Sequence, residues 1–120
     1  MSGAELYIAA VGEAESFVLE LSESSPSIPW RRVNLTGATL VSLFRRPLGG
    51  GATLAIDTAG VAPAARLTIE NAQSGELRLH PGSTYWASAG RWHCWFEITI
   101  GGIVYRCPRV GNRTIKCNAA

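Results

Sequence analysis

The side chains that most often do chemistry in proteins are few and far apart in this chain of 120 residues. Its two histidines, His80 and His93, belong to no motif that also supplies a nucleophile and an oxyanion donor. His93 adjoins Cys94, but neighbouring residues of a strand point to opposite faces, so this pair cannot share a metal ion or act as base and nucleophile. We therefore expect no catalytic residue, no metal site and no cofactor, and we predict that the protein is not an enzyme.

The three cysteines, Cys94, Cys107 and Cys117, cannot all pair within one chain. Their spacing matches neither a disulfide framework nor a zinc ribbon. The first thirty residues contain no Lys or Arg and so lack the basic start of a signal peptide. No apolar run approaches the roughly 18 residues that a membrane helix needs. We expect synthesis in a cytoplasm, reduced thiols and no membrane partner.

Basic residues beside glycines or aromatic residues are the remaining candidates for ligand binding. Arg45 and Arg46 precede the run Gly49-Gly50-Gly51, but no Gly-Lys-Ser or Gly-Lys-Thr follows, so we interpret the run as a loop. Arginines also alternate with tryptophans in the C-terminal half, which is a weak signal for single-stranded nucleic acid. The pI of about 8.6 and the acidic N-terminal segment argue against that partner, and we expect none.

Charge is distributed unevenly along the chain although the net charge is only +2. Residues 1–30 hold five glutamates and no Lys or Arg, whereas residues 78–120 hold six such bases and one glutamate. Two interpretations remain open. The acidic segment, with Glu13 and Glu15, contacts the basic end of a neighbouring copy, with Arg109 and Arg113, or the two ends attract each other within one chain.

These residues are expected to be positioned by short strands. Hydrophobic residues make up 47% of the chain and charged residues 17%, which suits one globular domain with a real core. The apolar runs are short, rich in β-branched and aromatic residues and separated by turn residues, a pattern typical of an all-β sandwich or small barrel. Residues 4–14 fit a strand or a helix equally well. The other strands are expected over residues 17–21, 38–45, 52–56, 66–70 and 76–79 and in both arms of 91–109.

The clearest element is a β-hairpin over residues 91–109, with Gly101-Gly102 as its two-residue turn. A tight turn pairs the residues on either side of it and so fixes the register of both strands. Glu97 then lies opposite Arg106, and this opposite-charge pair supports the register. The other face of the hairpin is apolar and is expected to face the core; it consists of Trp92, Cys94, Phe96, Ile98, Ile100, Ile103, Tyr105 and Cys107.

The aromatic residues are the best candidates for an interface, because tryptophan in a small domain is either core or a binding anchor. Trp95 falls on the hairpin face opposite the expected core, where it is an exposed anchor unless a second sheet covers it. Tyr85 and Trp86 lie in a turn-rich stretch, where they form either a platform for a sugar ring or a plug over the end of the sandwich. We favour the plug.

Taken in order, several segments resemble the N-terminal domain family of phage upper baseplate proteins. The similarity runs from about Leu6 to Lys116. The resemblance implies an immunoglobulin-like β-sandwich that serves in virions as a docking module, with no catalytic residue to carry over. The segments that carry it are Leu6-Tyr7-Ile8, Gly12-Glu13-Ala14-Glu15-Ser16-Phe17, Val33-Asn34-Leu35-Thr36-Gly37-Ala38-Thr39, Gly75-Glu76-Leu77-Arg78-Leu79, Ala89-Gly90-Arg91-Trp92 and Phe96-Glu97-Ile98-Thr99 with the Gly-Gly turn.

The sequence and this resemblance predict an immunoglobulin-like antiparallel β-sandwich with about 7–9 short strands and little or no helix. Residues 1–16 are expected to form an N-terminal strand or arm used in assembly, and residues 17–118 the single sandwich domain. The expected function is that of a structural protein of a bacteriophage virion, docking at the tail, baseplate, neck or capsid. Its partners are other virion proteins and copies of itself in a symmetric oligomer.

The expected interface residues come from the aromatic and charged sets above: Trp95, Trp86, Tyr85, Glu13, Glu15, Arg109 and Arg113. The alternative function is a carbohydrate-binding module that recognises host cell-surface glycans. It would use Tyr85, Trp86 and Trp95 as stacking surfaces.

Overall fold

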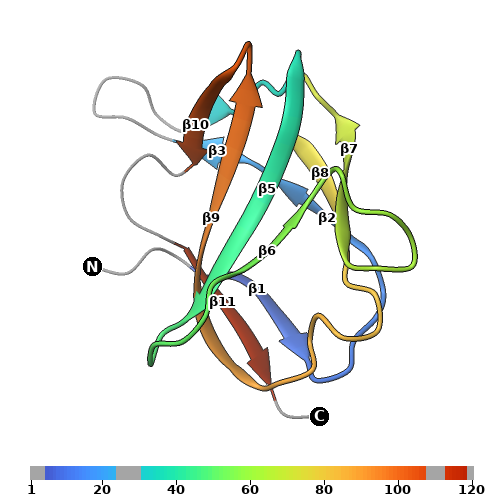
Figure 1. Cartoon of the computed structure of the whole chain (residues 1–120), viewed down its shortest axis with the longest axis vertical. Coiled ribbons are helices and arrows are strands. Elements are labelled where there is room, and N and C mark those ends of the chain that lie inside the picture. Colours follow the sequence, from blue (N-terminus) through green and yellow to red (C-terminus); the bar gives the residue numbers. More distant parts are fainter. Residues whose placement is uncertain (1–4, 24–30, 108–112, 119–120) are drawn as a thin grey trace.

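The structure is a computed structural model, and it describes residues 5–23, 31–107 and 113–118 (Figure 1). All regular structure in these residues is β-strand, and they contain no helix. This confirms the all-β class, and within the ambiguous segment 4–14 it places a strand over Glu5–Ala10. The strands are β1 (Glu5–Ala10), β2 (Phe17–Glu20), β3 (Ser22–Glu23), β4 (Arg31–Arg32), β5 (Ala38–Pro47), β6 (Leu54–Asp57), β7 (Arg66–Asn71), β8 (Glu76–His80), β9 (Gly90–Ile100), β10 (Ile103–Cys107) and β11 (Arg113–Asn118).

The large sheet has the strand order β1-β11-β9-β5-β6, and β10 also joins it by pairing with β9. The long strand β9 organises this sheet because β5 runs along one of its edges while two strands share the other edge. β11 pairs with the Gly90–Cys94 half of β9, and β10 pairs with the Phe96–Ile100 half. All these pairs are antiparallel except β1 with β11, which is parallel.

The small sheet has the order β2-β8-β7 and is antiparallel throughout. Alternate residues of both sheets are buried, as expected for two sheets that each turn one face to a shared core. Complete burial of one such leucine or phenylalanine contributes about 1.5–3 kcal/mol. The sandwich expected from the sequence is thus confirmed. The strand residues buried in this core include Leu19, Val41, Leu43, Leu67, Leu77, Leu79, Cys94, Phe96 and Ile98.

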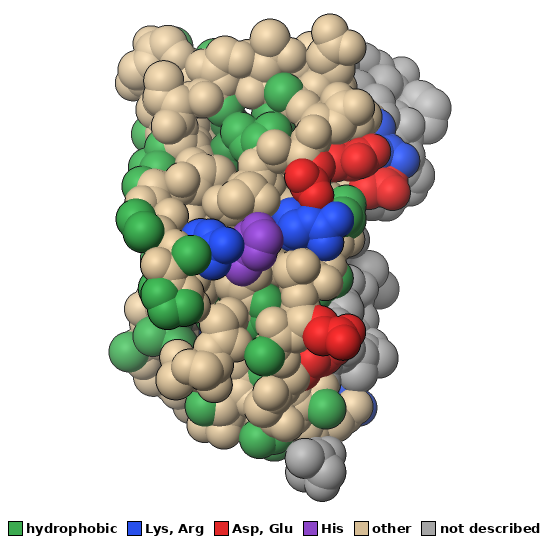
Figure 2. All heavy atoms as spheres, turned by 90° about the vertical axis from the view of Figure 1, so that its right-hand side faces the viewer, with side chains coloured by type: hydrophobic (Ala, Val, Ile, Leu, Met, Phe, Trp, Pro, Cys, Tyr) green, Lys and Arg blue, Asp and Glu red, His purple; other side chains and the backbone are tan. Residues whose placement is uncertain are grey.

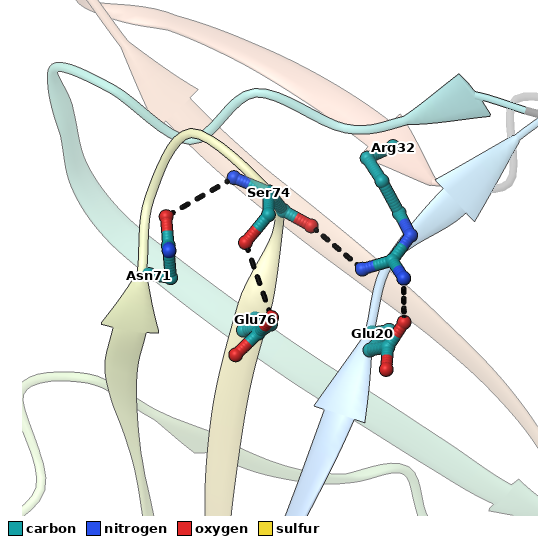
Figure 3. Close-up of polar contacts among 5 residues, drawn as sticks. All are labelled: Glu20, Arg32, Asn71, Ser74 and Glu76. Carbon is teal, nitrogen blue, oxygen red and sulfur yellow. Dashed lines mark hydrogen bonds and ion pairs between the residues drawn. The ribbon is translucent and has the colours of Figure 1, made fainter.

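A short ladder between β3 and β4, which the sequence did not predict, is tied to the small sheet by polar contacts (Figure 3). Arg32 forms an ion pair with Glu20 and donates a hydrogen bond to the Ser74 carbonyl oxygen at 3.2 Å. Gly75 in the same turn has φ of +68°, and a Cβ there would lie 2.5 Å from the Val33 carbonyl oxygen. The turn between β7 and β8 therefore requires glycine at this position.

The N-terminal segment is part of the large sheet. β1 pairs with β11 from Glu5 opposite Thr114 to Ala10 opposite Asn118. β1, which contains Glu5 of the five N-terminal glutamates, and β11 thus lie side by side within one chain. The sheet therefore includes Glu5–Ala10 of the segment 1–16, which was expected to form an N-terminal strand or arm used in assembly.

The register of the 91–109 hairpin is confirmed, with Glu97 opposite Arg106 and Phe96 opposite Cys107. The core face was predicted correctly for β9 and for Cys107 of β10, which is buried. It was predicted wrongly for the other two residues of β10, because Ile103 is 57% exposed and Tyr105 is 48% exposed. The reason is the place of β10 in the large sheet. Figure 1 shows β10 on the side of β9 away from β5 and from the small sheet. The small sheet therefore does not cover Ile103 and Tyr105.

Candidate functional site

The candidate site lies on the outer face of the large sheet, where β5 and β9 run side by side. Residues along β9 alternate between buried and half-buried, with Cys94 and Phe96 inside and Trp95 between them on the outer face. On β5, Phe44 is the direct cross-strand partner of Trp95. Among the described strands, the small sheet packs on the inner face of the large sheet, so Trp95 is not covered by it.

Trp95 is held in place by contacts on several sides. Its ring stacks against that of Phe44, with the centroids 5.5 Å apart and the planes 8° from parallel. Its Nε1 donates a hydrogen bond to Glu97 Oε2 at 3.2 Å. The guanidinium carbon of Arg106 lies 4.9 Å from the centroid of the tryptophan ring. We call these four residues, Phe44, Trp95, Glu97 and Arg106, the Trp95 patch.

The Trp95 patch has the properties of a binding surface. Tryptophan and arginine are the residues in which interface energy most often concentrates. The stacking and the cation–π contact are each worth about 0.5–1.5 kcal/mol and limit the motion of the ring before any partner arrives. A partner would therefore pay little conformational entropy to order it. The charges of Glu97 and Arg106 lie opposite each other across the β9–β10 ladder, which leaves the patch close to neutral.

Tyr85 and Trp86 do not belong to this surface. Tyr85 is 6% exposed and Trp86 is 1% exposed, and their rings meet edge to face with centroids 4.6 Å apart. Burial also raises the pKa of the Tyr85 hydroxyl well above its usual value of 10.0. The plug that we favoured is thus what the structure contains. The use of these two rings as a sugar platform or interface needs correction, because neither ring is accessible at the surface.

Arg45 is a functional-site neighbour that was not expected from the sequence: it is 5% exposed and lies among the core aromatic residues. Its guanidinium carbon is 4.0 Å from the centroid of Tyr85, 4.7 Å from Trp92 and 5.3 Å from Trp86. Its Nη2 also donates a hydrogen bond of 2.5 Å to the Tyr85 carbonyl oxygen. A signal was present in the sequence: Arg45 follows Val41 and Leu43 at the inward positions of a strand. We assign it a structural role, joining β5 to the segment before β9.

The charged residues expected at an interface are not gathered around Trp95. Glu13 and Glu15 lie on the loop from β1 to β2, where Glu13 accepts a hydrogen bond from the Ala10 amide at 3.3 Å. Arg113 begins β11, of which the structure describes the backbone at this position. Arg109 lies outside the described residues. Of the predicted interface residues, only Trp95 belongs to the Trp95 patch. Its neighbours there include Phe44 and Arg106, and neither was predicted to be a site residue.

The outer face of the small sheet is polar and carries the second group of titratable side chains. Figure 2 shows a histidine between arginines on this face, and the strand register identifies it as His80, flanked by Arg66 and Arg78. The Thr68 hydroxyl lies 3.0 Å from His80 Nε2, and Arg78 donates a hydrogen bond of 2.5 Å to Glu70. Desolvation, followed by the two positive neighbours, lowers the pKa of His80 below 6.5.

The described residues contain neither a metal site nor a disulfide between Cys94 and Cys107. Across residues 5–23, 31–107 and 113–118, no three His, Cys, Asp or Glu side chains are placed to hold one metal ion. Cys94 and Cys107 are buried and form no disulfide with each other, while the side chain of Cys117 lies outside the described part of the chain. Within the same residues, no helix is long and apolar enough to cross a membrane.

Comparison with known proteins adds no relative to this description. A scan against models of protein families finds no match, and a search among curated proteins finds none either.

Proposed function

We propose that this chain is a non-enzymatic docking module of a bacteriophage virion, an immunoglobulin-like sandwich that binds another virion protein through the Trp95 patch. The resemblance to phage upper baseplate proteins supports the virion role. The assignment of the binding surface rests on one observation, the fixed position of the Trp95 ring. Phe44, Glu97 and Arg106 hold this ring on the sheet face opposite the core.

The shape and charge of the patch favour a protein partner. The outer face of a β-sheet is broad, and its aromatic pair is flanked by a carboxylate and a guanidinium that compensate each other. A sugar ring would need the face of an aromatic ring for stacking, and Arg106 lies over the Trp95 ring. With Tyr85 and Trp86 buried, the carbohydrate-binding alternative loses two of its three aromatic residues.

Association with particles tests this proposal. Phage particles are induced from a strain that carries the gene, purified on a density gradient and analysed by quantitative mass spectrometry. We expect the chain to sediment with the particles at a fixed ratio to other structural proteins. Recovery of the chain only from the fractions without particles would contradict the virion role, and specific binding on a glycan array would favour the alternative.

A further inference from the structure

The outer face of the large sheet carries a group of cations beside the Trp95 patch. Residues directly opposite each other on neighbouring strands point to the same face of a sheet. Arg46 of β5 lies opposite His93 of β9, and Lys116 of β11 lies opposite Arg91 of β9. His93 and Arg91 alternate with buried residues of β9 and therefore share the outer face with Trp95. We call Arg46, Arg91 and Lys116 the basic cluster.

The charge of the basic cluster is not compensated by a neighbouring carboxylate. Arg46 and Arg91 are exposed, and Lys116 is half-buried. The two ion pairs found within residues 5–23, 31–107 and 113–118 include no member of the cluster. Like charges directly opposite each other destabilise a sheet, and Arg91 and Lys116 form such a pair. An anionic partner bound here would remove this repulsion.

The basic cluster lies next to the aromatic pair of the Trp95 patch. Phe44 and Trp95 are opposite each other, and the next outward-facing pair toward the start of β9 is Arg46 with His93. Diagonal neighbours on one face of a sheet are about 7–8 Å apart, and Arg46 and Arg91 are related in this way. One short segment of a partner can therefore contact an aromatic ring and two guanidinium groups at once.

We propose that the partner of the Trp95 patch presents an acidic protein segment. Its carboxylates bind the basic cluster, and an adjacent apolar side chain packs against Phe44 and Trp95. This inference rests on the proposed docking function and names the chemistry of the partner. The planar guanidinium of arginine suits it, because it can bind a carboxylate through two parallel hydrogen bonds. Opposite charges on two docking surfaces also speed their encounter and fix their relative orientation.

The surface fits a protein segment better than a nucleic acid. Proteins that bind single strands stack the bases on open aromatic rings. The Trp95 ring is instead stacked with Phe44 and approached by Arg106. Its Nε1 donates a hydrogen bond to the carboxylate of Glu97, which would repel a phosphate. The pI of about 8.6 also lies below the value of about 9 that nucleic-acid-binding domains exceed.

Binding of labelled probes to the full chain tests the acidic chemistry. The probes are a peptide of alternating glutamate and leucine, the corresponding peptide of lysine and leucine, and oligo-dT. Fluorescence anisotropy is measured at about 0.1 M salt, where exposed charges more than about 10 Å apart are screened from each other. We expect the glutamate peptide to bind and the lysine peptide not to bind.

Two variants with the same change of charge locate the binding. Arg91→Glu should raise the Kd for the glutamate peptide about tenfold, the effect of roughly 1.4 kcal/mol. Arg66→Glu is the matched control on the small sheet and should leave this Kd unchanged. Equal weakening by the two variants would overturn the proposal, and so would tighter binding of oligo-dT than of the glutamate peptide.

Carbodiimide cross-linking in purified particles tests the same contact with the natural partner. Lys116 is the one lysine of the chain, so it carries the only side-chain amine that can couple to a partner carboxylate. We expect mass spectrometry to find Lys116 joined to an acidic residue of another particle protein. Val61→Lys is the control, because Val61 is 75% exposed on the loop between β6 and β7 and the new amine should couple much less.

The outcomes of the two experiments separate this proposal from the virion role. Coupling of Lys116 only to glutamates of this chain would overturn the acidic partner, and so would equal coupling at positions 116 and 61. A chain that binds the glutamate peptide through Arg91 but is absent from particles would contradict the virion role and still support an acidic partner.

Discussion

Two clusters of arginine and aromatic rings lie back to back across β5 and β9. On the inner face Arg45 is packed against Tyr85, Trp86 and Trp92, and on the outer face Arg106 lies over Trp95. Strand alternation alone predicted the face of Trp95. It could not predict a buried Arg45, because an arginine is buried only where partners compensate its charge, and two of its aromatic neighbours come from a distant loop.

The first prediction compares neighbouring residues on opposite faces of β9. Phe96 is 3% exposed, and Phe96→Ala should lower the free energy of unfolding by about 3–5 kcal/mol through the cavity it leaves. Trp95→Ala removes one stacking contact, one cation–π contact and one hydrogen bond of a half-buried side chain, so it should cost about 1–2 kcal/mol. Urea denaturation of both variants, with Val61→Ala as a surface control, measures the difference. Equal large losses would show that both faces of β9 are buried.

The second prediction concerns pH. Because desolvation, Arg66 and Arg78 lower the folded-state pKa of His80 below 6.5, while Glu70 opposes them, the folded protein binds fewer protons than the unfolded chain as the pH falls through this range. The contribution of His80 to the free energy of unfolding is therefore complete above pH 6.5 and is lost as the pH falls through its folded-state pKa. His80→Gln should show a smaller loss of stability between about pH 8 and about pH 5 than the wild-type chain. An identical loss in both proteins would contradict this.

At the scale of elements, the sequence predicted best where local chemistry decides the structure. The Gly-Gly turn fixed the register of β9 with β10, and the expected strands 66–70 and 76–79 agree with β7 and β8 to within one residue at each end. It did not predict the ladder of β3 with β4 or the parallel pairing of β1 with β11. Those pairs join residues whose contacts are set by the whole fold rather than by a turn.

The third prediction tests the turn that sets this register. Gly101 has φ of +59° and open space around the position of a Cβ, so a substitution there is opposed by the backbone conformation alone. Gly101→Val should lower the free energy of unfolding by about 1–2 kcal/mol, whereas Gly101→Asn, which tolerates this conformation, should cost less than about 0.5 kcal/mol. Thermal melts of the two variants give the comparison. Equal effects would mean that the turn does not have this geometry.

At the scale of the whole molecule, the first and last described strands, β1 and β11, pair with each other. β1 lies along β11, Val11 donates a main-chain hydrogen bond of 2.9 Å to Asn118, and Gly12 donates one of 2.8 Å to Trp86. The N-terminal segment therefore stabilises the large sheet and the buried loop before β9. This changes the expected result of removing it, because an arm used only in assembly would leave the domain intact.

The fourth prediction follows from the pairing of β1 with β11. Deletion of residues 1–12 removes β1 from the sheet and should lower the Tm by about 10 °C or more, given about 4–8 °C per kcal/mol for domains near this size. Ala9→Pro interrupts the same ladder at one position and should act in the same direction, with Ala9→Ser as its control. A truncated chain that melts at the wild-type temperature would show that the N-terminal segment does not stabilise the domain.

Incorporation of Trp95→Ala into particles tests the proposed function most directly. The variant and the control Val61→Ala are expressed separately in a strain whose phage lacks the native gene, and the copy number of each in purified particles is measured by mass spectrometry. If the Trp95 patch is the docking surface, Val61→Ala is incorporated normally. Trp95→Ala remains folded in solution but is depleted about tenfold or more from the particles. A depletion of this size is expected for the loss of an interface anchor worth about 2 kcal/mol. Normal incorporation of folded Trp95→Ala would contradict the account.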